Sequence, residues 1–185
     1  MASLVTWPDL FVREHFLEPG VCDLLVAEMQ AIGGSAATVY GRTASGSIDA
    51  NVRKTLRIIP SSKTLEFVTE RLLSCKPAVE KHFNVSLSEC EQPQFLRYRE
   101  GDFFVAHQDG NTGLMKLDTE LRLVSTVIFL NALYDGGSLV FSSVHAPSFH
   151  MIAEPGTLVA FRSETTHEVT PVTHGERFSI ASWYR

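Results

Sequence analysis

Residues 98–110 read YREGDFFVAHQDG, and this stretch decides how the rest of the chain is interpreted. Residues 103–108 are rich in aromatic and apolar side chains and Gly110 follows closely, a pattern that predicts a β-strand ending in a turn. Residues two apart in a strand point to the same face. His107 and Asp109 would therefore project together from one rigid element. An imidazole beside a carboxylate is two thirds of a metal site, but such a pair also arises by chance, so a third ligand is required.

Short runs of the same kind surround this stretch and predict further strands. They are rich in Val, Ile, Phe, Thr and Tyr, and Gly, Asp, Asn and Pro separate them. The predicted strands cover residues 95–99, 103–108, 122–131, 138–142, 157–162, 167–171 and 178–184. Closely spaced short strands with turn signals between them are typical of an antiparallel sandwich or barrel.

The chain before Pro93 has a different pattern, which predicts helices. Apolar residues recur at helical spacing over 18–32, where two glycines follow, and over 62–73. Pro77 is expected to open a shorter helical piece that ends at Phe83, because proline suits a first helical turn.

The polar, glycine-bearing stretch 39–55 between the helices is expected to be a surface loop or a flap over a site. The predicted class is α+β, in one domain spanning 1–185. Residues 1–92 would form helical support and the flap-like loop, and 93–185 a β-barrel core.

Composition excludes more partners than it names. The chain has 185 residues, 44% hydrophobic and 20% charged, with a formal net charge of −5. A mildly acidic domain is a poor general binder of nucleic acids or membrane surfaces, which need a basic face. No apolar run approaches the roughly 20 residues of a membrane span, and no signal peptide is evident. Three cysteines without a CxxC pattern indicate neither a disulfide framework nor a zinc-thiolate site. We therefore expect a cytoplasmic protein.

His167 is the best candidate for the third ligand. It opens a predicted strand sixty residues after His107. Arg177, ten residues further on, begins the last strand and shares a face with Ser179, Ala181 and Trp183. From there its planar guanidinium could reach a barrel interior and bind a carboxylate in bidentate fashion.

Two histidines and one carboxylate on one face of a metal leave open coordination positions, as in non-haem Fe(II) oxygenases. Zinc-assisted hydrolysis remains an alternative on ligand type alone. The chain contains no His-Glu-x-x-His pattern, and no second acidic group is obviously placed as a base.

Together these pieces make residues 98–184 resemble the Fe(II)- and 2-oxoglutarate-dependent dioxygenases of the prolyl 4-hydroxylase family. YREGDFFVAHQD at 98–109 resembles the Tyr-x-x-Gly and His-x-Asp stretch of that family. RLVSTVIFLN at 122–131 and GGSLVF at 136–141 resemble its following strands. HEVTPVTHGERFSIASWY at 167–184 resembles its distal histidine, Gly-x-Arg and Trp block, and looks especially like that of the oxygen-sensing prolyl hydroxylases.

The resemblance implies a double-stranded β-helix, or jelly roll, buttressed by the N-terminal helices. It also implies three metal ligands that hold Fe(II), namely His107, Asp109 and His167. Arg177 would pair with the distal carboxylate of 2-oxoglutarate, and Tyr98 would donate a hydrogen bond to this cosubstrate. O2 would be the oxidant, with succinate and CO2 released. L-ascorbate, which the family often uses to keep iron reduced, is a further expectation.

Other positions carry weaker implications. Ser125 stands where the family usually has a threonine near the distal carboxylate, and Phe129 stands where many members have tyrosine. Trp183 would pack near the metal pocket. Arg53, with Thr55, resembles an Arg-x-Ser/Thr element of some members and would contact substrate.

The substrate stays open at this point. The first hypothesis is a prolyl residue in a peptide or protein, and the alternative is a free amino acid or small metabolite. Nucleic-acid demethylation is disfavoured because Trp183 stands where demethylases of a related class have a second arginine. A non-catalytic barrel is disfavoured because the ligand set is intact. The oligomeric state does not follow from the residues.

Overall fold

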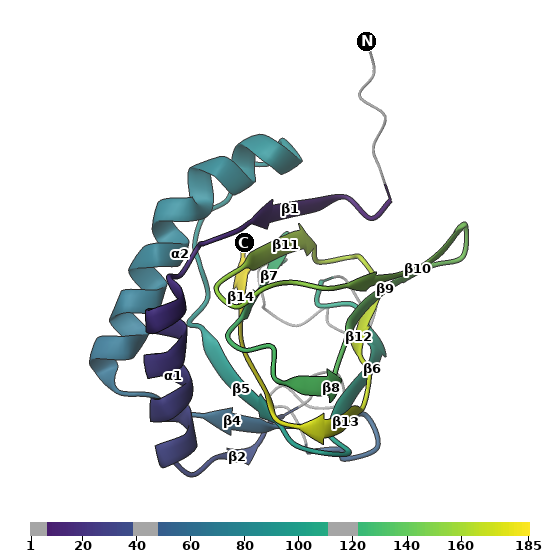
Figure 1. Cartoon of the computed structure of the whole chain (residues 1–185). Helices are drawn as coiled ribbons and strands as arrows, with labels where there is room; N and C mark the ends of the chain where they lie inside the picture. The colour runs from purple at the N-terminus through teal and green to yellow at the C-terminus, as the bar shows by residue number, and fades with distance from the viewer. Residues whose placement is uncertain (1–6, 39–47, 111–121) are drawn as a thin grey trace.

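The computed structural model describes residues 7–38, 48–110 and 122–185, in which two helices lie on one side of two facing β-sheets (Figure 1). The larger sheet has seven antiparallel strands. In spatial order they are β1 (Leu10–Arg13), β11 (Leu158–Arg162), β7 (Val124–Phe129), β14 (Arg177–Tyr184), β5 (Gln94–Tyr98), β4 (Leu56–Ile58) and β2 (Ser35–Ala36).

The smaller sheet has five antiparallel strands and faces the first. Its order is β10 (Ala146–Met151), β9 (Leu139–Ser143), β12 (His167–Val169), β6 (Phe103–His107) and β3 (Arg53–Lys54). A separate pair joins β8 (Tyr134–Gly136) to β13 (Val172–Gly175). The α+β class with a jelly-roll core is thereby confirmed, as are the strands predicted after Pro93, while β8, β10 and β13 were not predicted.

Strand β14 shows how the larger sheet serves two purposes. Its residues alternate between the two faces of the sheet, as the period of a strand requires. Phe178, Ile180 and Tyr184 pack into the main hydrophobic core with residues of both helices. Arg177, Ser179, Ala181 and Trp183 line a cavity on the opposite face. One strand therefore attaches the sheet to the helices and also forms a wall of the cavity.

The first helix, α1 (Pro19–Ala31), agrees with the prediction within a residue at each end. Proline occupies its first turn, where the missing N–H has no intrahelical partner to lose. Its buried face consists of Cys22, Leu25 and Met29.

The second helix corrects the prediction of two pieces, because α2 (Ser62–Phe83) continues through Pro77. Proline removes one intrahelical hydrogen bond and would normally break the helix. The buried positions nevertheless continue at helical spacing on both sides of it, at Leu72, Cys75, Val79 and Phe83. Burial of this continuous apolar stripe outweighs the local cost.

A second correction concerns the part before Pro93, which supplies strands as well as helices. The strands β1, β2 and β4 extend the larger sheet, and β3 extends the smaller one. They are two to four residues long, too short for a reliable period-two pattern. Of the expected flap, 39–47 lie outside the described residues, whereas Arg53 and Lys54 pair with β6. Because helices and strands share one core, we infer that they fold as one unit.

Candidate active site

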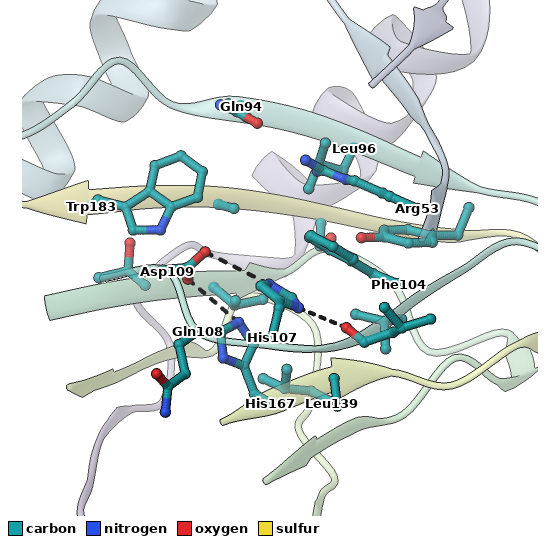
Figure 2. Close-up of a pocket in the computed structure, with 18 of the residues that line it drawn as sticks. Arg53, Gln94, Leu96, Phe104, His107, Gln108, Asp109, Leu139, His167 and Trp183 are labelled. Carbon is teal, nitrogen blue, oxygen red and sulfur yellow. Dashed lines mark hydrogen bonds and ion pairs between the residues drawn. The ribbon is translucent and has the colours of Figure 1, made fainter. Parts of the chain in front are cut away.

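The two sheets enclose a cavity of about 380 Å³ that contains every site residue predicted from the sequence except Ser125. Its walls come from β5, β7 and β14 on one side and from β3, β6, β9 and β12 on the other. Figure 2 shows His107, Asp109 and His167 pointing toward one another in this space, with Phe104, Arg53 and Trp183 around them.

His107 and His167 face each other across neighbouring strands. His107 ends β6, His167 begins β12, and the two are direct partners in the antiparallel register. Such partners lie about 4.5–5.5 Å apart, so side chains on the same face meet. The centroids of the two imidazole rings are 4.3 Å apart. Sheet pairing therefore brings together two residues that are sixty positions apart in the chain.

Asp109 completes the group from the turn that follows β6. Its backbone N–H and that of Gly110 both donate to the carbonyl of Ser163 at 2.9 Å, which fixes the turn. The carboxylate oxygens then lie 3.7 Å from Nε2 of His107 and 3.4 Å from Nε2 of His167 (Figure 2).

Both imidazoles are held in the same tautomer. Nδ1 of His107 donates to the carbonyl of Val105 at 2.8 Å, and Nδ1 of His167 donates to that of Thr165 at 2.9 Å. A carbonyl can only accept, so each Nδ1 carries a proton, and the lone pair of the neutral form of each imidazole is on Nε2, the side of Asp109. Metal-binding histidines are oriented by this kind of hydrogen bond from the far nitrogen.

The electrostatics of the group favour an ionised carboxylate. Burial opposes the charge of Asp109, but His167 and His107 hold the pKa of that carboxyl well below its usual range. Burial lowers the pKa of His107. Against the same effect of burial, the Asp109 charge raises the pKa of His167. The group therefore offers one ionised carboxylate and two imidazoles that can be neutral.

The donor atoms fit a metal ion. Two imidazole nitrogens and a carboxylate oxygen lie within 4.8 Å of one another. This is the two-histidine, one-carboxylate set typical of non-haem Fe(II) sites that keep coordination positions open.

Arg177 lies in the same cavity and is almost completely buried, with 1% of its surface exposed. Nη1 donates to Oγ of Ser179 at 2.9 Å, and Nε has no partner among the described residues. The guanidinium lies over the rings of Tyr98 and Phe129, at 5.2 and 5.3 Å from their centroids. A buried cation without a carboxylate is unfavourable, so this end of the cavity suits an anionic ligand.

Gly137 makes room for this arginine. Its φ of +57° belongs to the left-handed region, and a Cβ there would lie 3.1 Å from Cδ of Arg177 and 3.0 Å from Cγ2 of Val172. Gly137 therefore sets the space around the Arg177 stem.

Ser125 is not next to Arg177, contrary to the expectation from the family pattern. It is fully buried, and its hydroxyl lies 2.8 Å from that of Ser163, whose carbonyl holds the Asp109 turn. In the register it opposes Trp183, four positions along β14 from Ser179. The hydroxyl at the guanidinium is that of Ser179, which the sequence placed on the right face without assigning it a role.

Trp183 lines the cavity on the side of Asp109 (Figure 2). Its Nε1 has no partner among residues 7–38, 48–110 and 122–185. The guanidinium of Arg122 stacks on the indole at 3.8 Å from the ring centroid. Glu91 accepts two hydrogen bonds of 2.7 Å from Arg122 and one of 2.9 Å from Arg185. Sequence reasoning missed this network because its members are not adjacent in any motif.

Arg53 also lines the cavity, from the edge strand β3. Its guanidinium lies 4.7 Å from the centroid of Phe104. The other face of that ring is stacked on His107, with centroids 3.6 Å apart. The structure thus brings Arg53 into the same space as the three predicted metal ligands.

Comparison with known proteins identifies the class. Residues 93–185, half of the chain, match the sequence model of the 2OG-Fe(II) oxygenase superfamily. The chain belongs to this superfamily. Fe(II), 2-oxoglutarate and O2 are the reactants that membership implies, and the two-histidine, one-carboxylate set fits them.

Particular relatives are hydroxylases. A PKHD-type hydroxylase of Paracoccus denitrificans (strain Pd 1222) is 32% identical over 97% of this chain and 77% of its own length. A Pseudomonas putida prolyl-4-hydroxylase has a similar fold, with a TM-score of 0.73 and 23% identity over 96% of this chain and 92% of its own. A Trichoplax adhaerens prolyl hydroxylase, solved with a hypoxia-inducible-factor peptide fragment, has a TM-score of 0.72 and 17% identity over 96% and 84%. Among the described residues, no helix is long and apolar enough to cross a membrane.

Proposed function

We propose that this protein hydroxylates a prolyl residue within a peptide or protein. His107, Asp109 and His167 hold the Fe(II). When bound, the iron with 2-oxoglutarate and O2 supplies the oxidising chemistry that inserts oxygen into a C–H bond and releases succinate and CO2. The chain's own residues hold the metal, orient the two organic reactants and keep water out.

Arg177 binds the distal carboxylate of 2-oxoglutarate in this proposal. Nε of its buried guanidinium has no partner among the described residues, and a bound carboxylate would satisfy that donor and neutralise the charge. Tyr98, whose ring lies beneath the guanidinium, would donate a hydrogen bond from its hydroxyl to the cosubstrate. Ser179 holds Nη1 and so fixes the orientation of the guanidinium.

Trp183 and Arg53 line the part of the cavity that binds the substrate in this proposal. The Trp183 indole is held by Arg122 and leaves its N–H directed at no described partner. Such a donor suits a carbonyl of a peptide backbone.

The observation that favours a peptide over a free amino acid is the charge of the cavity lining. Among the described lining residues Asp109 is the sole carboxylate, and it belongs to the metal-binding set. A free amino acid would bring an ammonium group that needs an anionic partner. A prolyl residue in a peptide has no such charge and presents an apolar ring to walls that include Leu96, Leu139 and Val169. The prolyl hydroxylases of similar fold support this substrate class.

Three further parts of the proposal rest on composition and family. L-ascorbate would keep the iron reduced. The three free cysteines suit a reducing compartment such as the cytoplasm. Nucleic acid is not the substrate, in keeping with the net charge of −5.

Mass spectrometry tests the proposal. The purified protein, with Fe(II), 2-oxoglutarate and ascorbate, is incubated with N-acetylated, C-amidated proline peptides, with the same peptides carrying alanine for proline, and with free amino acids. We expect a gain of about 16 Da on proline peptides alone, because one oxygen atom is inserted. Oxygen gained by free amino acids alone, or turnover of methylated single-stranded oligonucleotides alone, would contradict it.

A further inference from the structure

Arg53 is a second buried guanidinium in the cavity, and its chemistry specifies more about the substrate than contact alone. The residue is 9% exposed, and its Nε has no hydrogen-bond partner in the part of the chain that the structure describes. Nη1 makes a long hydrogen bond of 3.3 Å to the carbonyl of Thr38. The charge itself is therefore not neutralised by any described carboxylate.

The position of this guanidinium is fixed by stacking. Phe104 lies between Arg53 and His107, with its ring 4.7 Å from the guanidinium carbon and 3.6 Å from the imidazole centroid. Backbone pairing of Arg53 with Phe104 in the register of β3 and β6 holds the two together. Figure 2 shows the Arg53 side chain above Phe104. Arg53 is thus one aromatic ring away from the metal-facing end of the cavity.

The other charged groups of the cavity already have partners or assignments. Arg177 is assigned to 2-oxoglutarate, and Arg122 is paired with Glu91 through two hydrogen bonds. Among the residues that the structure describes, Arg53 keeps a donor without a partner and no carboxylate compensates its charge, although the side chain is buried. An ionised guanidinium in such a place is stabilised most by a carboxylate, which matches the spacing of its N–H groups.

We propose that Arg53 binds a carboxylate of the substrate peptide, carried by an Asp or Glu side chain next to the hydroxylated prolyl residue. This inference rests on the proposed function and refines its substrate class to acidic proline-bearing segments. The separation of Arg53 from His107 by one ring agrees with the neighbouring position, because an extended peptide advances about 3.3–3.6 Å per residue.

Matched peptides test this inference with the wild-type protein. Blocked peptides carry Asp, Asn, Glu or Gln on either side of one proline, and kcat/KM for proline hydroxylation is measured for each. The acidic peptide should exceed its amide counterpart by roughly tenfold to a hundredfold on one side of the proline, as expected for one charge-assisted hydrogen bond in a buried site. Equal kcat/KM for each acid and amide pair would overturn the inference while leaving the prolyl function intact.

Variants locate the effect. Arg53→Gln should abolish the preference for acid over amide and leave KM for 2-oxoglutarate unchanged. Lys54→Gln is the matched control, because Lys54 lies on the same strand but is paired with Asp102 at 3.2 Å; it should keep the preference. A preference that survives in Arg53→Gln, or one lost in Lys54→Gln, would contradict the assignment. If no peptide of the series gains oxygen on proline, the proposed function itself fails.

Discussion

The two halves of the chain reach the cavity in different ways. Residues 93–185 supply the central strands of both sheets, with His107, His167 and Arg177 on these strands and Asp109 in the turn after β6. Residues before 93 supply two covering helices, edge strands and one buried arginine at the cavity wall. The chemistry common to the superfamily thus lies on strands paired on both sides. The residue assigned to substrate choice lies on an edge strand of two residues, where change disturbs less of the sheet.

The largest expected loss of activity comes from replacing one of the three predicted metal ligands in the C-terminal half. His107→Ala or Asp109→Ala should reduce release of succinate from 2-oxoglutarate at least about a thousandfold, because one of three metal donors is removed. Succinate is measured by mass spectrometry, with Fe(II) content measured in parallel. Equal succinate release by wild type and His107→Ala would refute the assignment of this group.

Arg177 separates the roles of the two arginines. Arg177→Gln should raise KM for 2-oxoglutarate about a hundredfold, because a charge-assisted bidentate contact is lost, whereas Arg53→Gln should leave it within about twofold. Steady-state kinetics with varied 2-oxoglutarate check this. The distinction between the two halves breaks down if both variants raise this KM to a similar extent.

Glu91 links the halves, and its effect should depend on pH. Although burial works against its charge, Arg122 and Arg185 hold the pKa of Glu91 below its ordinary value. Glu91→Gln should therefore lower the free energy of unfolding by about 2 kcal/mol at pH 7. A carboxyl whose pKa is lower in the folded state stabilises the fold at pH values above its pKa in the unfolded chain, which is near 4.3 for Glu. This contribution is lost as the pH falls through the pKa of the folded state.

Denaturant unfolding from pH 7 to pH 3.5 measures the difference in free energy of unfolding between wild type and Glu91→Gln. This difference should decrease toward low pH. A gap that is constant over this range would show that the ion pairs do not carry the difference.

The smallest effect is expected in α2. Pro77→Ala should stabilise the protein by about 1 kcal/mol. The restored intrahelical hydrogen bond stabilises the helix, and the greater freedom of the unfolded chain offsets part of this gain. No residue of α2 lines the cavity, so the kinetic constants should not change. Thermal unfolding and succinate assays on the same preparation compare the two. A changed KM would mean that the helical layer influences the cavity directly.

The sequence predicted the C-terminal half well for a physical reason. Strand alternation places Ser179 and Trp183 on one face with Arg177. The pairing of His107 with Asp109 was predicted in the same way, although Asp109 lies in the turn after β6, where the carbonyl of Ser163 holds it. The partnership of His107 with His167 depends on sheet register, which the chain order alone does not specify. There the resemblance to a family supplied what local pattern could not.

The N-terminal half was harder because its features are short or cooperative. Two-residue edge strands have no detectable period, and continuation of α2 through Pro77 depends on packing against the sheet.

The wrong prediction for Ser125, in the C-terminal half, also has its cause in tertiary structure. Its side chain was expected beside Arg177. The register instead places Ser125 opposite Trp183, at the other end of the strand, where its hydroxyl contacts that of Ser163.

Strand β14 has a consequence for how such a protein can change over generations. Its even-numbered side chains hold the helices and its odd-numbered ones line the cavity. Deleting one residue after Ile180, with the end of the strand kept in register, would turn Phe178 and Ile180 into the cavity and Arg177 toward the helices. A change in the length of this strand would therefore disturb the helical core and the cavity at the same time.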